Sequence, residues 1–600
     1  MRNGLALLAL ALSAASATAA DEACSLQRIG ELPVTMSGRQ PIVTGAINGI
    51  EARFLVDSGS FFSLLPADAK EKFGLKSHKK VGSIPVAGVG GFSFASAATA
   101  DRFSLAGLEL GEIKNVDFVL VRQSVGYSFV GIIGQNVLGI ADTEYDLANG
   151  VVRIFRPIGC KNKSLAYWKK SAPIAILEIS DSSAKRPHIL GFITLNGQKI
   201  RVMFDTGASF SMLTRSAAAR AGIKPGDPGV VDAGYAGGIG NRGVKTWIAQ
   251  AQSLDLGEEV IKNAKLRVGD TDLMGTADLL LGADFFLSHR VYVAKSQGKV
   301  YFSYNGGPVF DLSVAQNDTQ NDTQSATEGD TVVRTEPESR VETDAPKDAG
   351  AFRRRGAASL SRNDVRGALA DFDQAIKLDP NDAENYRQRA LAYASKKDRV
   401  AAKEDFDRAL TLKPDSSAMH FERGALHISA NDANAALTDF KEAIRLAPND
   451  DRLGLQLAFA FGQIDRPEEK IELLNTWLDA FPKHDSRSRV LNERCWARAT
   501  MDKELQLALT DCNAAIDLKR SPMYYDSRGL VYLRLGNAER SIDDYKRALR
   551  SSDDDPMSLF GLGLATIKQG DQTKGQKYIA EALAKDPKVQ ERYKKMGLEP

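Results

Sequence analysis

Cysteine and histidine are scarce in this sequence. Its 600 residues include four cysteines and six histidines. The cysteines form no close pair and have no histidine beside them, so the ligand spacing of a zinc site is missing. The histidines show no metal-ligand spacing either, and we expect each to be a surface or packing residue: His78, His188, His289, His420, His427 and His484.

Two motifs of other enzyme classes are also missing. No Gly-x-Ser-x-Gly sequence is present, which excludes the serine nucleophile elbow of an α/β-hydrolase. No glycine-rich loop ends in Gly-Lys-Ser or Gly-Lys-Thr, which excludes the usual phosphate loop. The formal net charge of +2 gives no electrostatic reason to expect nucleic acid or an anionic membrane as a partner. We therefore expect no cofactor and no nucleic-acid partner.

Long apolar runs are absent after the first 20 residues, "MRNGLALLALALSAASATAA". Arg2 supplies a positive start, Leu5 to Leu12 an apolar core, and the small residues up to Ala20 a cleavage site, as in a secretory signal peptide. An uncleaved membrane anchor is the alternative, but the apolar core is short for a membrane span. Residues 1–20 therefore predict an exported protein, periplasmic or secreted, with no integral membrane segment after cleavage.

Export would place the four cysteines in an oxidising compartment, where disulfide bonds form. Four cysteines allow three pairings. Pairing within one region favours Cys24 with Cys160 and Cys495 with Cys512. Buried free thiols remain the alternative.

Three regions follow the signal peptide, in keeping with a length that suggests about three or four domains. The first is rich in Gly, Val, Phe and Ser, and the last is helical in its patterning. Between them, residues 311–350 are acidic, poor in apolar residues and without periodicity. We expect this segment to be a flexible linker.

A period of 34 residues runs through residues 351–590 and indicates six or seven repeats. It is carried by a small residue, an aromatic residue, an alanine and a proline, with a degenerate fourth unit and a fifth that contains two cysteines. The positions are Gly356, Ala390 and Gly424; Phe372, Phe406 and Phe440; Ala375, Ala409 and Ala443; and Pro380, Pro414, Pro448 and Pro482. The pattern resembles the tetratricopeptide repeat, which implies an all-α solenoid built from stacked helical pairs.

The resemblance also implies a role for the repeats. Such solenoids usually hold a peptide or a partner protein on their concave face, and we expect the same here. A spacer or a dimerisation arm is the alternative.

The region before the linker is a tandem duplication with an offset of 148 residues. "EARFLVDSGSFFSLLP" around Asp57 matches "KIRVMFDTGASFSMLT" around Asp205. Each copy has an Asn-Gly turn, which favours a hairpin, then a strand ending in Asp and a short helical segment. A glycine-rich loop and an apolar pair followed by glycine complete each copy. The copies span roughly residues 28–160 and 170–310.

Each copy resembles a retropepsin, the half-molecule of an aspartic protease. The resemblance implies an all-β, double-lobed barrel domain in which Asp57 and Asp205 meet at a pseudo-twofold axis. It also implies that the Ser58 and Thr206 hydroxyls link the two loops, and that the apolar-apolar-Gly turns pack behind them. The supporting residues are Ser58, Gly59, Thr206, Gly207, Ile133, Gly134, Leu281 and Gly282; the flap candidates are Gly88, Gly90, Gly91, Gly237, Gly238 and Gly240.

Two adjacent carboxyl groups explain why a charged residue would end an apolar strand. At a separation of about 3 Å they share one proton rather than both ionise. The charged group then acts as general base on a water, and the protonated group polarises the peptide carbonyl. We therefore expect an aspartic endopeptidase that cleaves a polypeptide substrate without a metal.

Two alternatives stay open. The same fold would serve as a catalytically silent scaffold that binds an extended peptide by strand addition. Alternatively, each half would pair with the same half of a second chain, although a short tether favours pairing within one chain.

Overall fold

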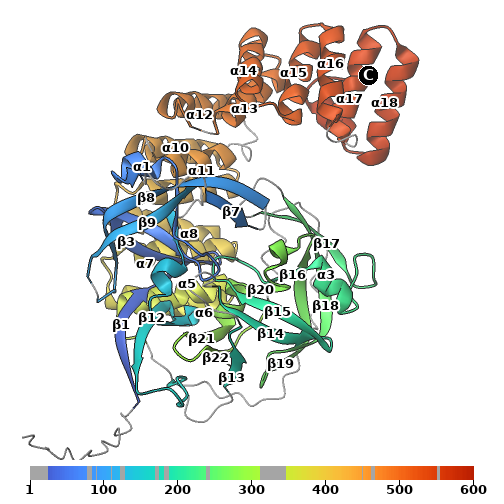
Figure 1. Ribbon diagram of the computed structural model, residues 1–600. Helices are drawn as coiled ribbons and strands as arrows, with labels where there is room; N and C mark the ends of the chain where they lie inside the picture. The colour runs from blue at the N-terminus through green and yellow to red at the C-terminus, as the bar shows by residue number, and fades with distance from the viewer. Residues whose placement is uncertain are drawn as a thin grey trace, which may run out of the picture. The chain divides into compact units, whose positions relative to one another are not determined.

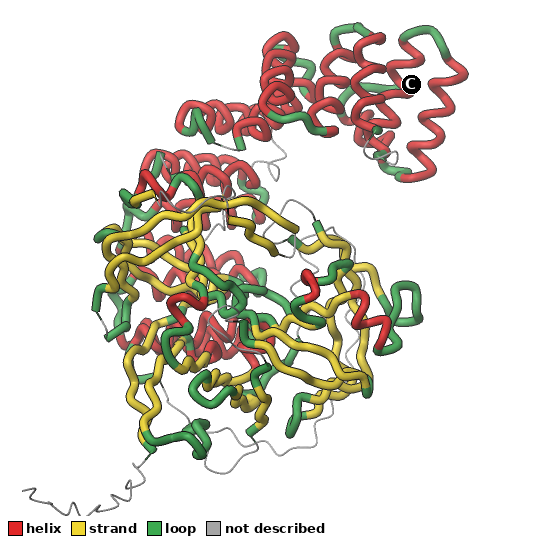
Figure 2. The backbone as a smooth tube through the Cα atoms, in the orientation of Figure 1, coloured by secondary structure: helices red, strands yellow, loops and turns green. Residues whose placement is uncertain are grey.

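The computed structural model describes residues 24–77, 84–88, 91–109, 111–121, 129–168, 174–180, 188–237, 243–310, 346–448, 450–460, 467–484, 486–550 and 555–600. The predicted signal peptide and residues 311–345 of the predicted linker lie outside the described residues. The described chain divides into a β-rich unit, up to residue 310, and a helical unit that begins after residue 345. Figures 1 and 2 show this contrast of strands and helices, which confirms the predicted fold class.

The first lobe is a sheet of nine strands. Asn48 and Gly49 close the hairpin between its second and third strands, with φ values of 51° and 84° that suit this tight turn. A short helix, α1 (Ala69–Lys72), follows the fourth strand, as the sequence predicted. The strands are β2 (Thr35–Ser37), β3 (Gln40–Ile47), β4 (Ile50–Val56), β5 (Leu64–Pro66), β6 (Lys76–Ser77), β7 (Ile84–Gly88), β8 (Gly91–Leu105), β9 (Ile113–Val121) and β10 (Gly131–Ile133).

The second lobe repeats this plan with seven strands. Asn196 and Gly197 close its first hairpin with φ values of 47° and 79°, and helix α3 (Arg215–Arg220) takes the place of α1. Both predicted Asn-Gly hairpins are therefore confirmed. The strands are β14 (Leu190–Leu195), β15 (Gln198–Phe204), β16 (Met212–Thr214), β17 (Val231–Ala236), β18 (Val244–Asp255), β19 (Val260–Gly269) and β20 (Leu279–Leu281).

A third sheet is built from both halves of the duplication, which the sequence did not predict. Its six strands lie in the order β1, β12, β11, β21, β22, β13. At its centre β11 and β21 pair antiparallel, and Glu144 faces Tyr292, its own equivalent at the offset of the duplication. The pseudo-twofold axis therefore passes between these two strands. Their bounds are β1 (Ser25–Pro33), β11 (Asp142–Asp146), β12 (Val151–Ile158), β13 (Ala175–Glu178), β21 (His289–Ala294) and β22 (Lys299–Tyr304).

A buried charge cluster and a disulfide reinforce this shared sheet. Arg153 Nη1 lies 2.7 Å from Glu144 Oε1, and Arg290 Nη2 from the other half lies 3.0 Å from the same oxygen. Glu144 is fully buried and Arg290 is 2% exposed. At the sheet edge, Cys24 is bonded to Cys160, just beyond the paired ends of β1 and β12. The halves are thus connected through ion pairs as well as backbone pairing.

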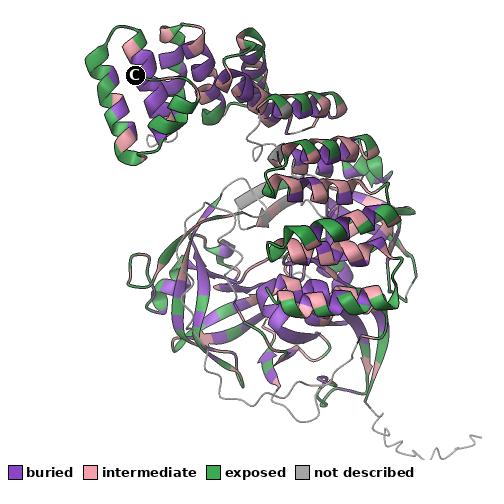
Figure 3. Cartoon of the chain, turned by 180° about the vertical axis from the view of Figure 1, so that it is seen from behind, coloured by how far each residue is buried: buried purple, intermediate pink, exposed green. Residues whose placement is uncertain are grey.

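The helical unit is a series of antiparallel hairpins. Its described residues form seven helical pairs and a final short helix, and Figure 3 shows buried and exposed stripes along the helices. The first helix begins at Ala349, inside the predicted linker, and the last ends beyond residue 590. The helices are α5 (Ala349–Ser361), α6 (Val365–Leu378), α7 (Ala383–Ser395), α8 (Arg399–Leu412), α9 (Ser417–Ser429), α10 (Ala433–Leu446), α11 (Asp451–Ala460), α12 (Pro467–Ala480), α13 (Arg487–Thr500), α14 (Leu505–Leu518), α15 (Pro522–Arg534), α16 (Ala538–Leu549), α17 (Pro556–Lys568), α18 (Gln572–Lys585) and α19 (Val589–Lys595).

The small and aromatic residues of the period meet inside several of the pairs. A Cβ atom added to Gly424 would lie 2.6 Å from the Phe440 ring, so only a very small residue fits there. The residue before the small one is an arginine that forms a two-pronged ion pair with an aspartate on the second helix, a favourable geometry. These pairs are Arg355–Asp371, Arg389–Asp405, Arg423–Asp439, Arg494–Asp511 and Arg528–Asp544.

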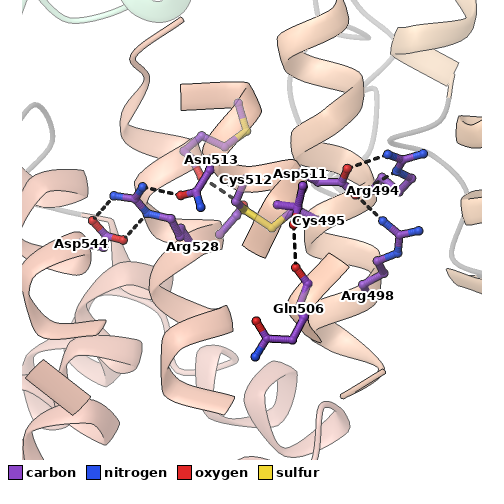
Figure 4. Close-up of a disulfide and its surroundings, with 12 residues drawn as sticks. Arg494, Cys495, Arg498, Gln506, Asp511, Cys512, Asn513, Arg528 and Asp544 are labelled. Carbon is purple, nitrogen blue, oxygen red and sulfur yellow. Dashed lines mark hydrogen bonds and ion pairs between the residues drawn. A yellow bond between two sulfur atoms is a disulfide. The ribbon is translucent and has the colours of Figure 1, made fainter. Parts of the chain in front are cut away.

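The fifth pair replaces this contact with a disulfide. Cys495 follows Arg494 and Cys512 follows Asp511, so the two sulfur atoms occupy the places of the small and the aromatic residue (Figure 4). Both cysteines are fully buried. The structure therefore has both disulfides that pairing within regions favoured, rather than free thiols. No helix among the described residues is long and apolar enough to span a bilayer.

We expect this second disulfide to stabilise the helical unit. Its short loop predicts that replacing both cysteines with alanine lowers the free energy of unfolding by about 3 kcal/mol. The double change Cys495→Gly and Cys512→Phe, which restores the pair found in the third repeat, should recover part of that loss. Thermal unfolding followed by circular dichroism checks both. An alanine variant as stable as wild type under oxidising conditions would contradict the expectation.

Candidate active site

Asp57 and Asp205 stand at the ends of equivalent strands. Asp57 follows β4 and Asp205 follows β15, and each backbone amide is held by the apolar turn behind it. Asp57 N donates to Ile133 O at 3.0 Å, and Asp205 N donates to Leu281 O at 2.9 Å. Because β10 and β20 run parallel to β4 and β15, the two turns fix both aspartates in the same way.

The residues after the aspartates link the two loops reciprocally. Ser58 Oγ donates to Phe204 O at 2.9 Å, and Thr206 Oγ1 donates to Val56 O at 2.7 Å. Each hydroxyl also accepts the other residue's backbone N–H, at 2.9 and 3.0 Å. Ser58 is fully buried and Thr206 nearly so. Serine in place of the commoner threonine therefore preserves every bond that a hydroxyl makes here.

Glycine allows each loop to touch the opposite carboxyl group. A Cβ atom on Gly59 would lie 2.4 Å from Asp205 Cγ, and one on Gly207 would lie 2.3 Å from Asp57 Cγ. Real Cβ atoms do not approach this closely, so any side chain would push the carboxyl groups away. Gly134 and Gly282, behind the loops, also have no room for a side chain. A Cβ atom on Gly134 would lie 2.6 Å from the Phe62 backbone, and one on Gly282 would lie 2.6 Å from the Phe210 backbone.

The two carboxyl groups are neighbours within one chain, each against the glycine of the opposite loop. Asp57 Oδ1 accepts the amides of Gly59 at 2.9 Å and Ser60 at 2.7 Å. Asp205 Oδ1 accepts those of Gly207 at 2.9 Å and Ala208 at 3.3 Å. Burial raises the pKa of both aspartates, and the charge of Asp205 raises the pKa of Asp57 further. The pair therefore keeps a shared proton to higher pH than an isolated aspartate does.

A layer of polar residues behind the loops was missed in the sequence. In the first lobe, Asn136 Oδ1 accepts the amide and the hydroxyl of Ser63, and Ser63 Oγ accepts the Gly134 amide. In the second, Asp284 and Ser211 make the same bonds around Gly282. Each residue of this layer lies 148 residues from its equivalent in the other lobe. A comparison of polar positions beyond the aspartate motif, at the offset of the duplication, could therefore have found them.

The flap candidates are only partly described. Gly88 pairs with Gly91 at the end of the hairpin formed by β7 and β8. Gly237 follows β17, whose partner is β18. Gly90, Gly238 and Gly240 lie outside the described residues. Elsewhere in the described chain, no cluster of three His, Cys, Asp or Glu side chains has the arrangement of a metal site.

His188 lies against the loop that carries Asp57, a contact that its interpretation as a surface or packing residue did not specify. Its Nδ1 atom is 3.1 Å from Gly59 O. No spacing rule connects His188 with Asp57, because the contact forms only when the second lobe meets the first.

Two known family models match this chain, one in each of the two regions of the structure. A family model described as "Aspartyl protease" matches residues 43–137 and 193–285, which contain Asp57 and Asp205. A second, described as "Tetratricopeptide repeat", matches residues 387–451 and 527–589. The two lobes thus match the aspartyl-protease family model in tandem, and the helical unit has the fold of a tetratricopeptide-repeat solenoid.

Similar proteins match a limited part of the chain. Cellulose synthase 1 operon protein C of Komagataeibacter xylinus is 39% identical over 66 residues, which are 11% of this chain and 5% of that protein. A protein from Komagataeibacter sucrofermentans, cellulose synthase operon protein C, matches to the same extent. The chain therefore covers a small fraction of these relatives.

Solved structures similar to the chain include yeast Tom70 and YrrB, which is described as "a TPR protein with an unusual peptide-binding site". Tom70 has 20% identity and a TM-score of 0.26, covering 42% of this chain and 52% of Tom70. YrrB has 18% identity and a TM-score of 0.26, covering 31% of this chain and 95% of YrrB.

The two lobes pair with each other within one polypeptide. The loops of the two lobes bond to each other, and the shared sheet joins the same two halves. The structure therefore shows the intrachain arrangement, in which Asp57 meets Asp205.

Proposed function

We propose that this protein is an exported aspartic endopeptidase whose catalytic residues are Asp57 and Asp205. The observation that carries the proposal is the meeting of these two carboxyl groups, each held by two backbone amides and by the glycine of the opposite loop. A purely structural carboxylate needs no second carboxylate beside it, because like charges repel. The arrangement suits a pair that binds one proton and one water.

The reaction follows from the unequal protonation of the pair. A carboxylate takes a proton from the bound water, and the water oxygen attacks the peptide carbonyl carbon. The protonated partner donates a hydrogen bond to the carbonyl oxygen, where negative charge develops. Collapse of the tetrahedral intermediate breaks the C–N bond, and the carboxyl group that took the water's proton passes it to the leaving nitrogen. Ser58 and Thr206 keep both carboxyl groups in place throughout.

The remaining parts of the chain extend this activity. The apolar start of the sequence supports export, to the periplasm or beyond the cell. The tetratricopeptide solenoid supports capture of the polypeptide substrate or of a partner protein on its concave face. The supporting role of Ile133, Leu281 and the flap glycines is part of the same proposal.

Digestion of an unfolded polypeptide tests the function. Purified protein should generate new chain termini, identified by mass spectrometry, at acidic pH, and a pepstatin-type inhibitor should suppress them. Folded protein that binds the polypeptide with defined stoichiometry yet produces no new termini at any acidic or neutral pH would overturn the proposal and favour a peptide-binding scaffold.

A further inference from the structure

One histidine touches the aspartate site from outside the duplicated motif. His188 precedes β14 in the second lobe, but its partner is in the first: Nδ1 lies 3.1 Å from Gly59 O. The ring meets the Phe61 ring edge-on, with centroids 6.2 Å apart. The side chain is partly buried. His188 therefore rests on the loop that carries Asp57.

The bond to Gly59 fixes the ring's tautomer. A carbonyl oxygen only accepts, so Nδ1 must carry the hydrogen. The Gly59 carbonyl belongs to the same peptide group as the Ser60 N–H, which donates to Asp57 Oδ1 at 2.7 Å. A continuous chain of hydrogen bonds thus runs from the ring through one peptide to the carboxyl group. Bonds linked in this way polarise and strengthen one another.

The second lobe lacks this chain. Its equivalent amide, Ala208 N, lies 3.3 Å from Asp205 Oδ1, longer than the 2.7 Å on the first side. The position equivalent to His188 is Gln40, which makes no hydrogen bond to Gly207 O in the described structure. The two aspartates, otherwise related by symmetry, therefore have different surroundings.

Charge adds to this difference. Burial lowers the pKa of His188, while the Gly59 carbonyl and the Asp205 carboxylate oppose that shift. In return, a charged His188 favours the ionised form of Asp205. Among the described residues, Asp205 is the charged group whose field shifts the pKa of His188. The first-lobe loop contacts the ring through uncharged groups, the Gly59 carbonyl and the Phe61 ring.

We propose that His188 is a positioning residue of the aspartate pair, which holds the Gly59–Ser60 peptide against Asp57 and makes the two aspartates inequivalent. The inference rests on the proposed endopeptidase function. His188 touches neither carboxyl group directly in the described contacts, so it acts through the peptide and through its charge.

Two substitutions separate the hydrogen bond from the charge. His188→Leu removes both and should lower kcat roughly fivefold to tenfold, with KM nearly unchanged. It should also move the acid limb of the kcat profile to higher pH, because the ionised pair loses a favourable charge. His188→Gln introduces the residue of the equivalent position, whose amide is able to donate to Gly59 O, and should restore most of kcat without restoring the acid limb. A leucine variant with unchanged kcat and profile, or changed in KM alone, would overturn the inference.

A measurement independent of turnover separates this inference from the proposed function. Nitrogen-detected NMR of the full-length protein should show the neutral His188 ring protonated at Nδ1, and Asp205→Asn should lower the pKa of His188. A ring protonated at Nε2 would overturn the inference even in an active enzyme. Wild-type protein without turnover would overturn the proposed function, and the ring tautomer would still decide the positioning role.

Discussion

Replacing Asp205 with asparagine should abolish peptide cleavage and at the same time make the β-rich unit more stable at neutral pH. Asparagine preserves the shape of the side chain and its acceptor oxygen, but it neither binds nor releases a proton. Loss of the shared proton should lower kcat/KM at least about a thousandfold. Asp57→Asn should do the same, because neither carboxyl group has a substitute.

The gain in stability follows from the direction of the pKa shifts. Burial raises the pKa of both aspartates in the folded protein above the value of 3.8 that an isolated aspartate has. As pH rises through the folded pKa, ionisation therefore costs the folded state more than the unfolded state. Removing one ionisable group should raise Tm by about 2–4 °C at neutral pH. The difference should vanish at strongly acidic pH, where both carboxyl groups are protonated in both states.

Cleavage assays and calorimetry on the same samples measure the expected loss of activity and the expected rise in Tm. Asp101→Asn is a matched control, because the Asp101 carboxyl group is 47% exposed and pairs with a largely exposed Lys76 on the same lobe. That variant should change neither cleavage nor Tm appreciably. Full activity in either active-site variant would exclude an intramolecular pair, and lower stability at neutral pH would contradict the raised pKa values.

The fold and the aspartate pair could be predicted from the sequence because both depend on short-range patterns that are repeated at a fixed distance. The Asn-Gly turns, the strands ending in Asp57 and Asp205, and the 34-residue helical period each follow from local backbone preferences. Duplication made them recognisable, since chance rarely places so many matches at one offset.

The remainder depended on contacts between segments that have no common pattern. The central sheet forms because β11 and β21 pair across the twofold axis. The sequence of either strand alone does not identify the strand with which it pairs. His188 reaches Gly59 only after the lobes have joined. The disulfide between Cys495 and Cys512 was predictable as one of three pairings, but its replacement of the small–aromatic contact required the helices to be in place.

The same central sheet explains how two separate lobes hold the aspartates in register. Arg290 from the second half lies 3.0 Å from Glu144 of the first, and it also packs over Trp168 at 5.0 Å from the ring centroid. Glu144 and Asp146 are both fully buried, so they depend on Arg153 and Arg290 for compensating charge. Removing one partner of such a cluster leaves a buried charge uncompensated, which costs about 3–5 kcal/mol.

Arg290→Met should therefore unfold the β-rich unit at a much lower denaturant concentration, although its methylene packing is retained. The loss should be smaller at acidic pH. Burial raises the pKa of Glu144 and the two arginines oppose the shift, so losing Arg290 raises it further and makes ionisation at neutral pH costly. Chemical unfolding at two pH values measures this difference.

Arg102→Met provides the control, because Arg102 and its partner Glu112 are each about half exposed, at 54% and 48%, and their charged atoms lie 3.7 Å apart. Its effect should stay below about 1 kcal/mol. An Arg290 variant no less stable than this control would contradict the cluster's role. If the cluster does fasten the lobes, cleavage by the folded Arg290→Met protein should fall as well, since Asp57 and Asp205 reach each other only across the interface that Arg290 helps to hold.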